Sequence, residues 1–190
     1  MDNETHVIKA GSTAHGQFET DVSIERAGWE WSSIRVLALP AGGSETVASG
    51  VSELLVLPLS GGCAVEVNGE THVLNGREEV WSVIIDYLYI PRGTTFTVRS
   101  ESGGRFALPA AKATRDLPVR YCPVTEVVTT LRGAGPCSRQ VNNYALGNDL
   151  ETSHLLACEV LTPGGNWSSY PPHKHDERLR SEERRVGKEC

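Results

Sequence analysis

Residues 63–74 read CAVEVNGETHVL, and this stretch determines which class of fold the chain adopts. Apolar and polar residues alternate on both sides of Asn68-Gly69, as they do in strands with one buried face. Asn and Gly both tolerate the positive φ angles of a type I′ turn, so an Asn-Gly step between alternating runs is a strong hairpin signal. We therefore predict a β-hairpin centred on Asn68-Gly69.

Short β signals continue on both sides of this hairpin. Each is rich in β-branched and apolar residues and stops at Gly, Pro or Ser, which favour turns. No window shows a sustained period of 3.6 residues. Short strands separated by turn residues predict an all-β fold of sandwich or barrel type. The runs cover residues 31–39, 52–59, 80–90, 94–99, 105–108, 124–131 and 154–161.

Three prolines divide the predicted strands into two groups. Pro109, Pro118 and Pro123 lie in a stretch without a strand pattern, which we interpret as a linker over residues 109–123. We predict one complete small β-barrel over residues 1–108. Residues 124–179 then hold the opening strands of a second barrel.

The overall composition excludes several classes of protein. The 190 residues are 39% hydrophobic and 22% charged, which is ordinary for a globular protein. No apolar run has the roughly 18 residues of a membrane span, and residues 1–10 lack the apolar core of a signal peptide. The net charge of −6 argues against nucleic-acid binding. Five cysteines without a CxxC pair favour free thiols. We expect a cytoplasmic protein that binds neither membrane nor nucleic acid.

A histidine pair near the C-terminus is the candidate metal site. His173 and His175 flank one residue, and side chains two positions apart in a strand point to the same face. Two neutral imidazoles on one face are a natural half of a divalent-metal site. Two unrelated surface histidines are the alternative interpretation.

The histidines lie in the stretch GNWSSYPPHKHD, residues 165–176, which resembles the signature of the 5-deoxy-glucuronate isomerase family of myo-inositol catabolism. That family is related to uronate ketol-isomerases. Residues 132–135, 137–143 and 159–160 also resemble it, residues 86–94 resemble a cupin second motif in their Pro-x-Gly core, and the resemblance covers most of residues 1–179. It implies a bicupin, that is two small β-barrels or jelly rolls, and it leaves a homo-oligomer open.

The resemblance implies an aldose–ketose isomerase that converts 5-deoxy-glucuronate, a small sugar acid, into 2-deoxy-5-keto-gluconate. It implies a divalent metal, zinc or manganese, held by His173, His175 and two ligands further along. The first barrel departs from the metal-binding pattern, because Thr94-Thr95-Phe96 stands where a histidine is expected. We therefore predict a first barrel without metal ligands. A metal-dependent cupin dioxygenase and a non-catalytic sugar-binding cupin remain as alternatives.

Arg139 is the candidate substrate ligand. An arginine can bind a carboxylate through two parallel hydrogen bonds, which suits a sugar acid. A structural ion pair or a loop anchor is the alternative role for Arg139. The sequence does not indicate which residue is the catalytic base.

The last eleven residues, 180–190, read RSEERRVGKEC and resemble the translation of a sequencing adapter. Such a segment is left out of fold reasoning. We expect the natural sequence to continue differently after Leu179. The second barrel would then be truncated here, and this chain by itself would be inactive.

Overall fold

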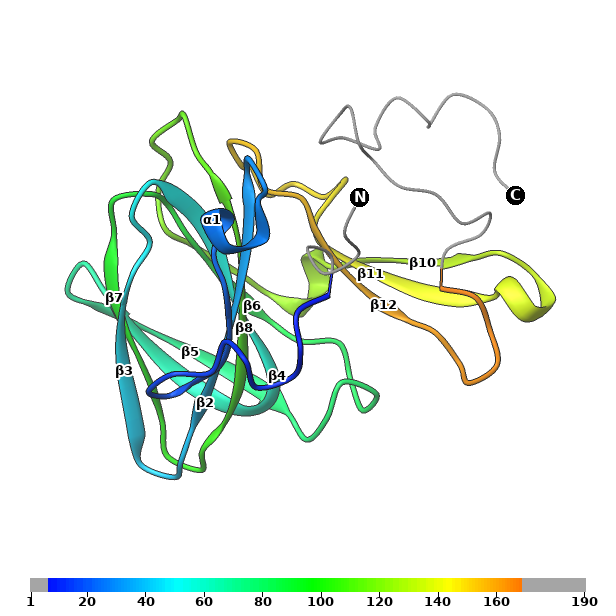
Figure 1. Ribbon diagram of the computed structural model, residues 1–190, viewed down its shortest axis with the longest axis horizontal. Helices are drawn as coiled ribbons and strands as arrows, with labels where there is room; N and C mark the ends of the chain where they lie inside the picture. Colours follow the sequence, from blue (N-terminus) through cyan, green and yellow to red (C-terminus); the bar gives the residue numbers. More distant parts are fainter. Residues whose placement is uncertain (1–6, 169–190) are drawn as a thin grey trace.

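The computed structural model describes residues 7–168, and nearly all of the regular structure is β (Figure 1). Within these residues the α-helix is α1, Ile24–Ala27, and short 3-10 helices cover Val124–Glu126 and Gly135–Cys137. The predicted all-β class is confirmed. The strands are β1 Phe18–Val22, β2 Ser32–Leu39, β3 Gly43–Ala48, β4 Ser52–Val67, β5 Glu70–Arg77, β6 Tyr87–Ile90, β7 Thr95–Ser100, β8 Gly104–Lys112, β9 Arg120–Cys122, β10 Val128–Arg132, β11 Arg139–Ala145 and β12 Ala157–Leu161.

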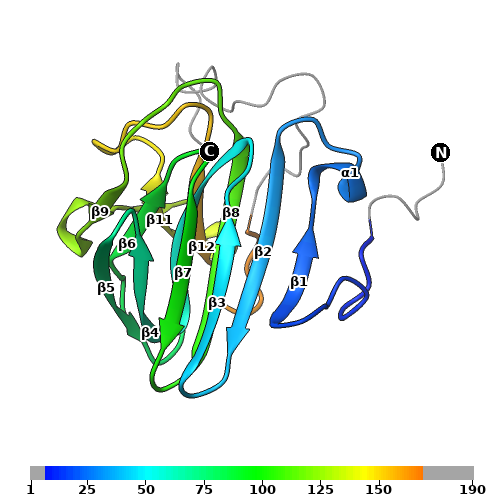
Figure 2. The same cartoon turned by 90° about the vertical axis from the view of Figure 1, so that its left-hand side faces the viewer.

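The first nine strands form one curled antiparallel sheet. Its main path runs β1-β2-β8-β4-β6-β9, while β5 and β7 pair with β4, and β3 pairs with β7. Figure 2 views the layer that contains β3 and β7. The two layers enclose an apolar core, which is the double-sheet arrangement of jelly rolls and cupins. Fully buried core side chains include Leu37, Leu54, Val65, Val98 and Phe106.

The predicted hairpin is confirmed. Val67 of β4 pairs with Glu70 of β5, and the two residues between them have positive φ angles of 52° at Asn68 and 81° at Gly69. These angles are those of a type I′ turn, whose twist matches the twist of the flanking strands.

Strand β4 is one 16-residue strand, whereas the sequence predicted two runs separated by a stop at Ser60-Gly61-Gly62. Its first half pairs with β6 and β8, and its second half pairs with β5 and β7. The pairing register shifts on both sides of Gly61, which has a φ of 71°. A Cβ at Gly61 would lie 2.3 Å from the Gly103 carbonyl oxygen. The predicted stop was wrong because these glycines bend the strand between the two layers without ending it.

The apolar runs of β4 and β6 are continuous because both faces of these strands are buried. Leu54 and Val56 point into the barrel core, while Leu55 and Leu57 pack outward in a second cluster. That second cluster also contains Tyr144, Leu150 and Leu155 from the C-terminal region. The three-stranded antiparallel sheet β10-β11-β12 is therefore packed against the outside of the barrel, from which it extends (Figure 1).

Glu53 is a polar anchor within this packing. Its carboxylate is fully buried and accepts backbone hydrogen bonds from Ser153 (2.8 Å), His154 (2.5 Å) and Leu155 (2.7 Å). The Tyr89 hydroxyl also donates to it at 2.6 Å. Burial raises the pKa of Tyr89, as does its hydrogen bond to Glu53. A carboxylate from the barrel thus binds the segment that leads into β12.

Two predicted boundaries differ from the observed ones. The predicted linker, residues 109–123, is strand at both ends, because β8 continues to Lys112 and Arg120–Cys122 forms β9 beside β6. The predicted run 80–90 is strand only from Tyr87, and residues 80–86 form a loop instead. Strands β10, β11 and β12 lie within residues 124–179, and the second barrel and the bicupin arrangement stay predictions. Among the described residues, no helix is long and apolar enough to cross a membrane.

Candidate functional site

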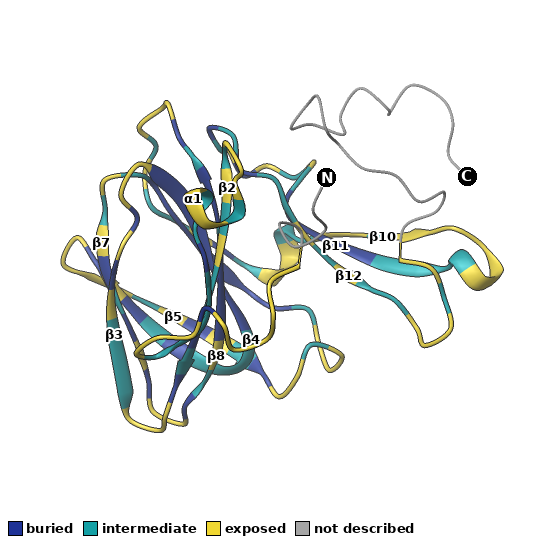
Figure 3. Cartoon of the chain, viewed as in Figure 1, coloured by how far each residue is buried: buried dark blue, intermediate teal, exposed yellow. Residues whose placement is uncertain are grey.

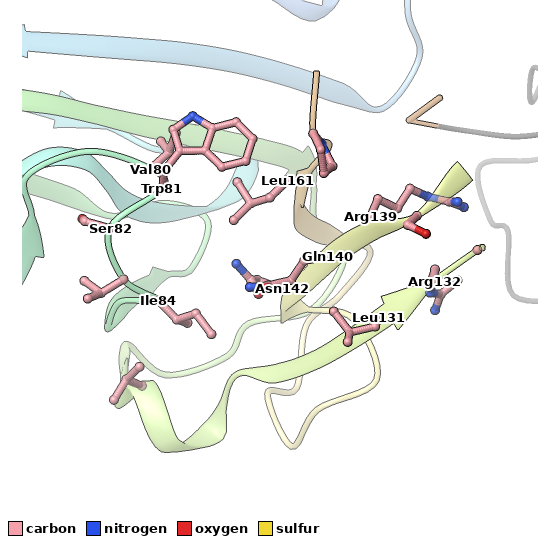
Figure 4. Close-up of a pocket in the computed structure, with 15 residues that line it drawn as sticks. Val80, Trp81, Ser82, Ile84, Leu131, Arg132, Arg139, Gln140, Asn142 and Leu161 are labelled. Atoms are coloured by element: carbon pink, nitrogen blue, oxygen red, sulfur yellow. Dashed lines mark hydrogen bonds between the residues drawn. The ribbon is translucent and has the colours of Figure 1, made fainter. Parts of the chain in front are cut away.

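A pocket of about 900 Å³ lies between the 80–84 loop of the barrel and the three-stranded sheet. Trp81, Val80 and Ile84 lie on the barrel side, and Gln140, Asn142 and Leu161 lie on the sheet side (Figure 4). The walls are largely apolar with a polar row on the sheet. The full lining is Val80, Trp81, Ser82, Val83, Ile84, Val124, Leu131, Arg132, Gly133, Ser138, Arg139, Gln140, Asn142, Leu161 and Pro163.

The pairing register explains which side chains face the loop. Leu131, Gln140 and Leu161 stand side by side across β10, β11 and β12. Because side chains alternate along a strand, these residues share one face of the sheet. That face points toward Trp81 (Figure 4). This row faces the loop, and Arg132 and Arg139 complete the lining where the two strands end and begin.

A buried ion pair joins the barrel to this sheet. Arg77, at the end of β5, makes two hydrogen bonds to the Glu159 carboxylate of β12, one of them 3.1 Å from Nη1 to Oε2. The Arg77 side chain is fully buried and that of Glu159 is 12% exposed. A bidentate pair of this kind fixes orientation as well as distance. Arg77 therefore determines where β12 lies relative to the barrel.

Arg77 also holds the loop that forms the other wall of the pocket. Its Nη1 donates to the carbonyl oxygens of Val80 (3.3 Å) and Val83 (3.2 Å), and its Nε donates to Pro58 (3.1 Å). One guanidinium thus contacts both walls. Sequence reasoning missed Arg77, because its partner Glu159 is 82 positions away.

Asn142 extends this network along the floor of the pocket. It donates to Glu159 at 3.0 Å, and its side-chain oxygen accepts from Gln140 (2.9 Å) and from Thr129 (3.2 Å). The Tyr144 hydroxyl lies 3.5 Å from the same Glu159 oxygen, and burial raises the pKa of Tyr144. The floor is therefore a set of polar side chains held in defined orientations.

Comparison with known proteins identifies the family. A model of the KduI/IolB family matches residues 6–188. This chain belongs to the KduI/IolB family. The family resemblance expected from residues 165–176 is thereby confirmed. The matched range enters residues 180–190, whose interpretation as foreign sequence stays a prediction and which lie outside the described residues.

Curated relatives of this KduI/IolB chain are named as isomerases. A 5-deoxy-glucuronate isomerase of Halalkalibacterium halodurans is 32% identical over 173 residues, covering 86% of this chain and 61% of the relative. One from Geobacillus thermodenitrificans is 34% identical, covering 82% of this chain and 57% of the relative. The chain thus spans about three fifths of the length of these curated relatives.

A solved structure shares the fold of this KduI/IolB chain. It is an IolB-like protein from Salmonella typhimurium LT2, with a TM-score of 0.79 and 29% sequence identity. The likeness covers 89% of this chain and 65% of that protein.

The predicted metal ligands His173 and His175 lie outside the described residues. Within residues 7–168, no group of three or more His, Cys, Asp or Glu side chains could hold a metal ion. The metal site at the histidine pair stays a prediction.

Arg139 lies where β11 begins and lines the pocket at the end farthest from Trp81 (Figure 4). Its Nη1 donates to the Cys137 carbonyl at 3.0 Å, which orients the side chain. It forms no ion pair with any residue that the structure describes. Its role as a substrate ligand stays a prediction.

Two cysteines are poor candidates for a nucleophile. Cys63 and Cys122 are buried, and burial raises the pKa of Cys63 to about 12 and also raises that of Cys122. The nucleophile is the thiolate and not the thiol, so both groups are unreactive at neutral pH. Their role is packing within the two apolar clusters.

Proposed function

We propose that this protein is an aldose–ketose isomerase that converts 5-deoxy-glucuronate into 2-deoxy-5-keto-gluconate in inositol catabolism. The observation that carries the proposal is the 32–34% identity, over more than four fifths of the chain, to curated 5-deoxy-glucuronate isomerases. Membership of the KduI/IolB family and the shared fold of the IolB-like protein support it.

The reaction moves a carbonyl from C1 to C2 of the sugar. A base must remove the proton from C2, and the enediolate charge that develops must be stabilised. The pocket contributes binding to this chemistry, with an apolar wall at Trp81 and fixed amide groups at Gln140 and Asn142. We include zinc or manganese at His173 and His175 in the proposal, since a bound divalent ion acts as a Lewis acid toward sugar oxygens.

The test uses the protein expressed from its natural reading frame. It is incubated with 5-deoxy-glucuronate under anaerobic conditions, and the products are followed by NMR. We expect the ketose to form without oxygen. Absence of the ketose would contradict the proposal, and conversion that requires oxygen would indicate a dioxygenase instead.

The histidine pair is tested in the same protein by measuring bound metal after dialysis. We expect His173→Ala and His175→Ala each to lose most of the bound metal, while His72→Ala, in strand β5, keeps it. Equal metal content in all variants would exclude the pair as ligands. For the 190-residue chain we expect weak metal binding and no turnover, so turnover by that chain would show the prediction of an inactive chain to be wrong.

A further inference from the structure

Two arginines stand opposite each other at one end of the pocket. Arg132, the last residue of β10, pairs directly with Arg139, the first residue of β11. Residues that face each other in an antiparallel pair have Cβ atoms about 4.5–5.5 Å apart, and their side chains lie on the same face. Figure 4 shows both side chains at the end of the pocket that is farthest from Trp81.

This arrangement is electrostatically unfavourable without an anion. Like charges directly opposite each other in a sheet are destabilising. The residues that line the pocket include two arginines and no aspartate or glutamate. Glu159, on the neighbouring strand, is engaged by Arg77. Within the described part of the chain, neither Arg132 nor Arg139 has a carboxylate partner.

The hairpin between the two arginines is built to hold them in register. Gly133 has a φ of 76°, and a Cβ there would lie 2.2 Å from the Cys137 carbonyl oxygen. That same oxygen accepts the hydrogen bond from Arg139 Nη1. A guanidinium has five N–H groups, so this bond orients Arg139 and leaves most of its donors for a ligand.

The chain also enters the histidine-containing stretch beside this hairpin. Asn166 Nδ2 donates to the Ser138 carbonyl at 2.8 Å, and the Trp167 backbone N–H donates to the Pro136 carbonyl at 2.8 Å. The signature that contains His173 and His175 therefore starts at the same end of the sheet as the two arginines.

We propose that Arg132 and Arg139 together form a carboxylate clamp that binds the acid group of a sugar acid. Two planar guanidinium groups can donate parallel pairs of hydrogen bonds to one carboxylate, which also removes their mutual repulsion. By the same register, both arginine side chains start from the face opposite to that of Gln140, at the end of the sheet, so the clamp holds the acid group at the edge of the pocket. This proposal rests on the proposed function for the identity of the ligand, and it adds Arg132 as a residue that determines specificity.

The test measures binding of D-glucuronate and of D-glucose to the full chain by isothermal titration calorimetry. We expect glucuronate to bind at least about tenfold more tightly than glucose, since the two differ in a single carboxylate. Arg132→Gln and Arg139→Gln should each remove this preference. Arg132→Lys should recover only part of it, because an ammonium group keeps the charge and loses the bidentate geometry.

Arg99→Gln serves as the matched control, because Arg99 is an exposed arginine on β7 of the barrel. Circular dichroism confirms that each variant is folded. Wild-type preference for glucuronate in folded Arg132→Gln would overturn the clamp. So would a lack of preference in the wild-type chain, which would indicate that the arginines pair with a carboxylate of the protein itself.

The two proposals fail in different ways. If the protein from the natural reading frame isomerises 5-deoxy-glucuronate and Arg132→Gln does so with unchanged KM and kcat, the clamp is wrong and the function stands. If glucuronate binding needs both arginines and no isomerisation occurs, the clamp stands and the function is wrong.

Discussion

The barrel β1–β9 and the sheet β10–β12 are stabilised in different ways. The barrel encloses its own apolar core between two layers, whereas Tyr144 and Ala145 of the sheet pack in a cluster shared with the barrel and β10 is largely exposed (Figure 3). On the sheet, Val128, Leu131 and Val160 are exposed by 42%, 82% and 42%. A small three-stranded sheet with this much exposed apolar surface depends on its neighbour for stability. The contacts between the two regions therefore decide whether the pocket exists.

The largest expected effect comes from the ion pair between these regions. Removing one partner of a buried pair leaves an uncompensated charge, which costs about 3–5 kcal/mol. We expect Arg77→Ala to lower the free energy of unfolding by this amount, measured by urea denaturation. Trp81 should also become more mobile, because the 80–84 loop loses its bonds to Arg77.

A double variant shows whether charge or shape matters at this pair. Replacing both partners by apolar residues of similar volume is often neutral or stabilising. We expect Arg77→Met combined with Glu159→Leu to recover much of the lost stability. Additive losses in the double variant would contradict this account.

Two leucines, one in the barrel and one in the sheet, test next whether the two regions differ in how they are stabilised. Leu54 is fully buried in the barrel, whereas Leu131 on β10 is mostly exposed. Leu54→Ala should cost about 2–5 kcal/mol, because it leaves a cavity in a packed core. Leu131→Ala should change the unfolding free energy by less than about 0.5 kcal/mol. Similar losses at the two positions would mean that the sheet has a core of its own.

The Glu53 anchor should have a moderate and local effect. Glu53→Gln replaces an acceptor of charge-assisted bonds by a neutral amide, at a cost of about 1–3 kcal/mol. We expect hydrogen exchange to become faster at Ser153, His154 and Leu155 while the amides of the barrel core stay protected. The control is Glu66→Gln, at an exposed position of the same strand. Uniform loss of protection in the Glu53 variant would show that the anchor supports the whole fold.

The smallest effect is expected at the exposed ion pair of Arg92 and Asp116, 2.6 Å apart, which contrasts with the buried pair. The hydrogen bond from Arg92 lowers the pKa of Asp116 below its usual 3.8. A depressed carboxyl pKa contributes stability above the unfolded-state pKa, and this is lost as the pH falls through the folded-state pKa. The small Tm difference between wild type and Asp116→Asn should therefore vanish only in strong acid. A difference that persists there would have another cause.

Much of the barrel could be predicted because its signals are local. The alternating runs at 31–39 and 94–99 correspond to β2 and β7, and the Asn-Gly step to the hairpin. Strands β1, β3 and β11 were missed, because short polar runs such as RQVNNYA form strands only when neighbours pair with them. The 80–86 run was misassigned because its apolar residues line a pocket instead of a sheet.

The candidate site was predictable only in part. Arg139 was singled out because arginine suits a carboxylate, and the structure places it at the pocket. No local feature of the sequence singles out Arg132, because its proposed role depends on its pairing with Arg139 across the two strands. The histidine pair is identified by its surrounding signature and lies outside the described residues.

Local chemistry was enough to specify the all-β class and the type I′ hairpin, and the resemblance of residues 165–176 to a known signature indicated the family. A positive φ and a two-residue period are properties of a few adjacent residues. Only the folded chain brings Arg77 to Glu159 across 82 positions, Glu53 to the backbone of residues 153–155, and the 80–84 loop to β11. These contacts depend on burial and on strand order, which no short stretch of sequence contains.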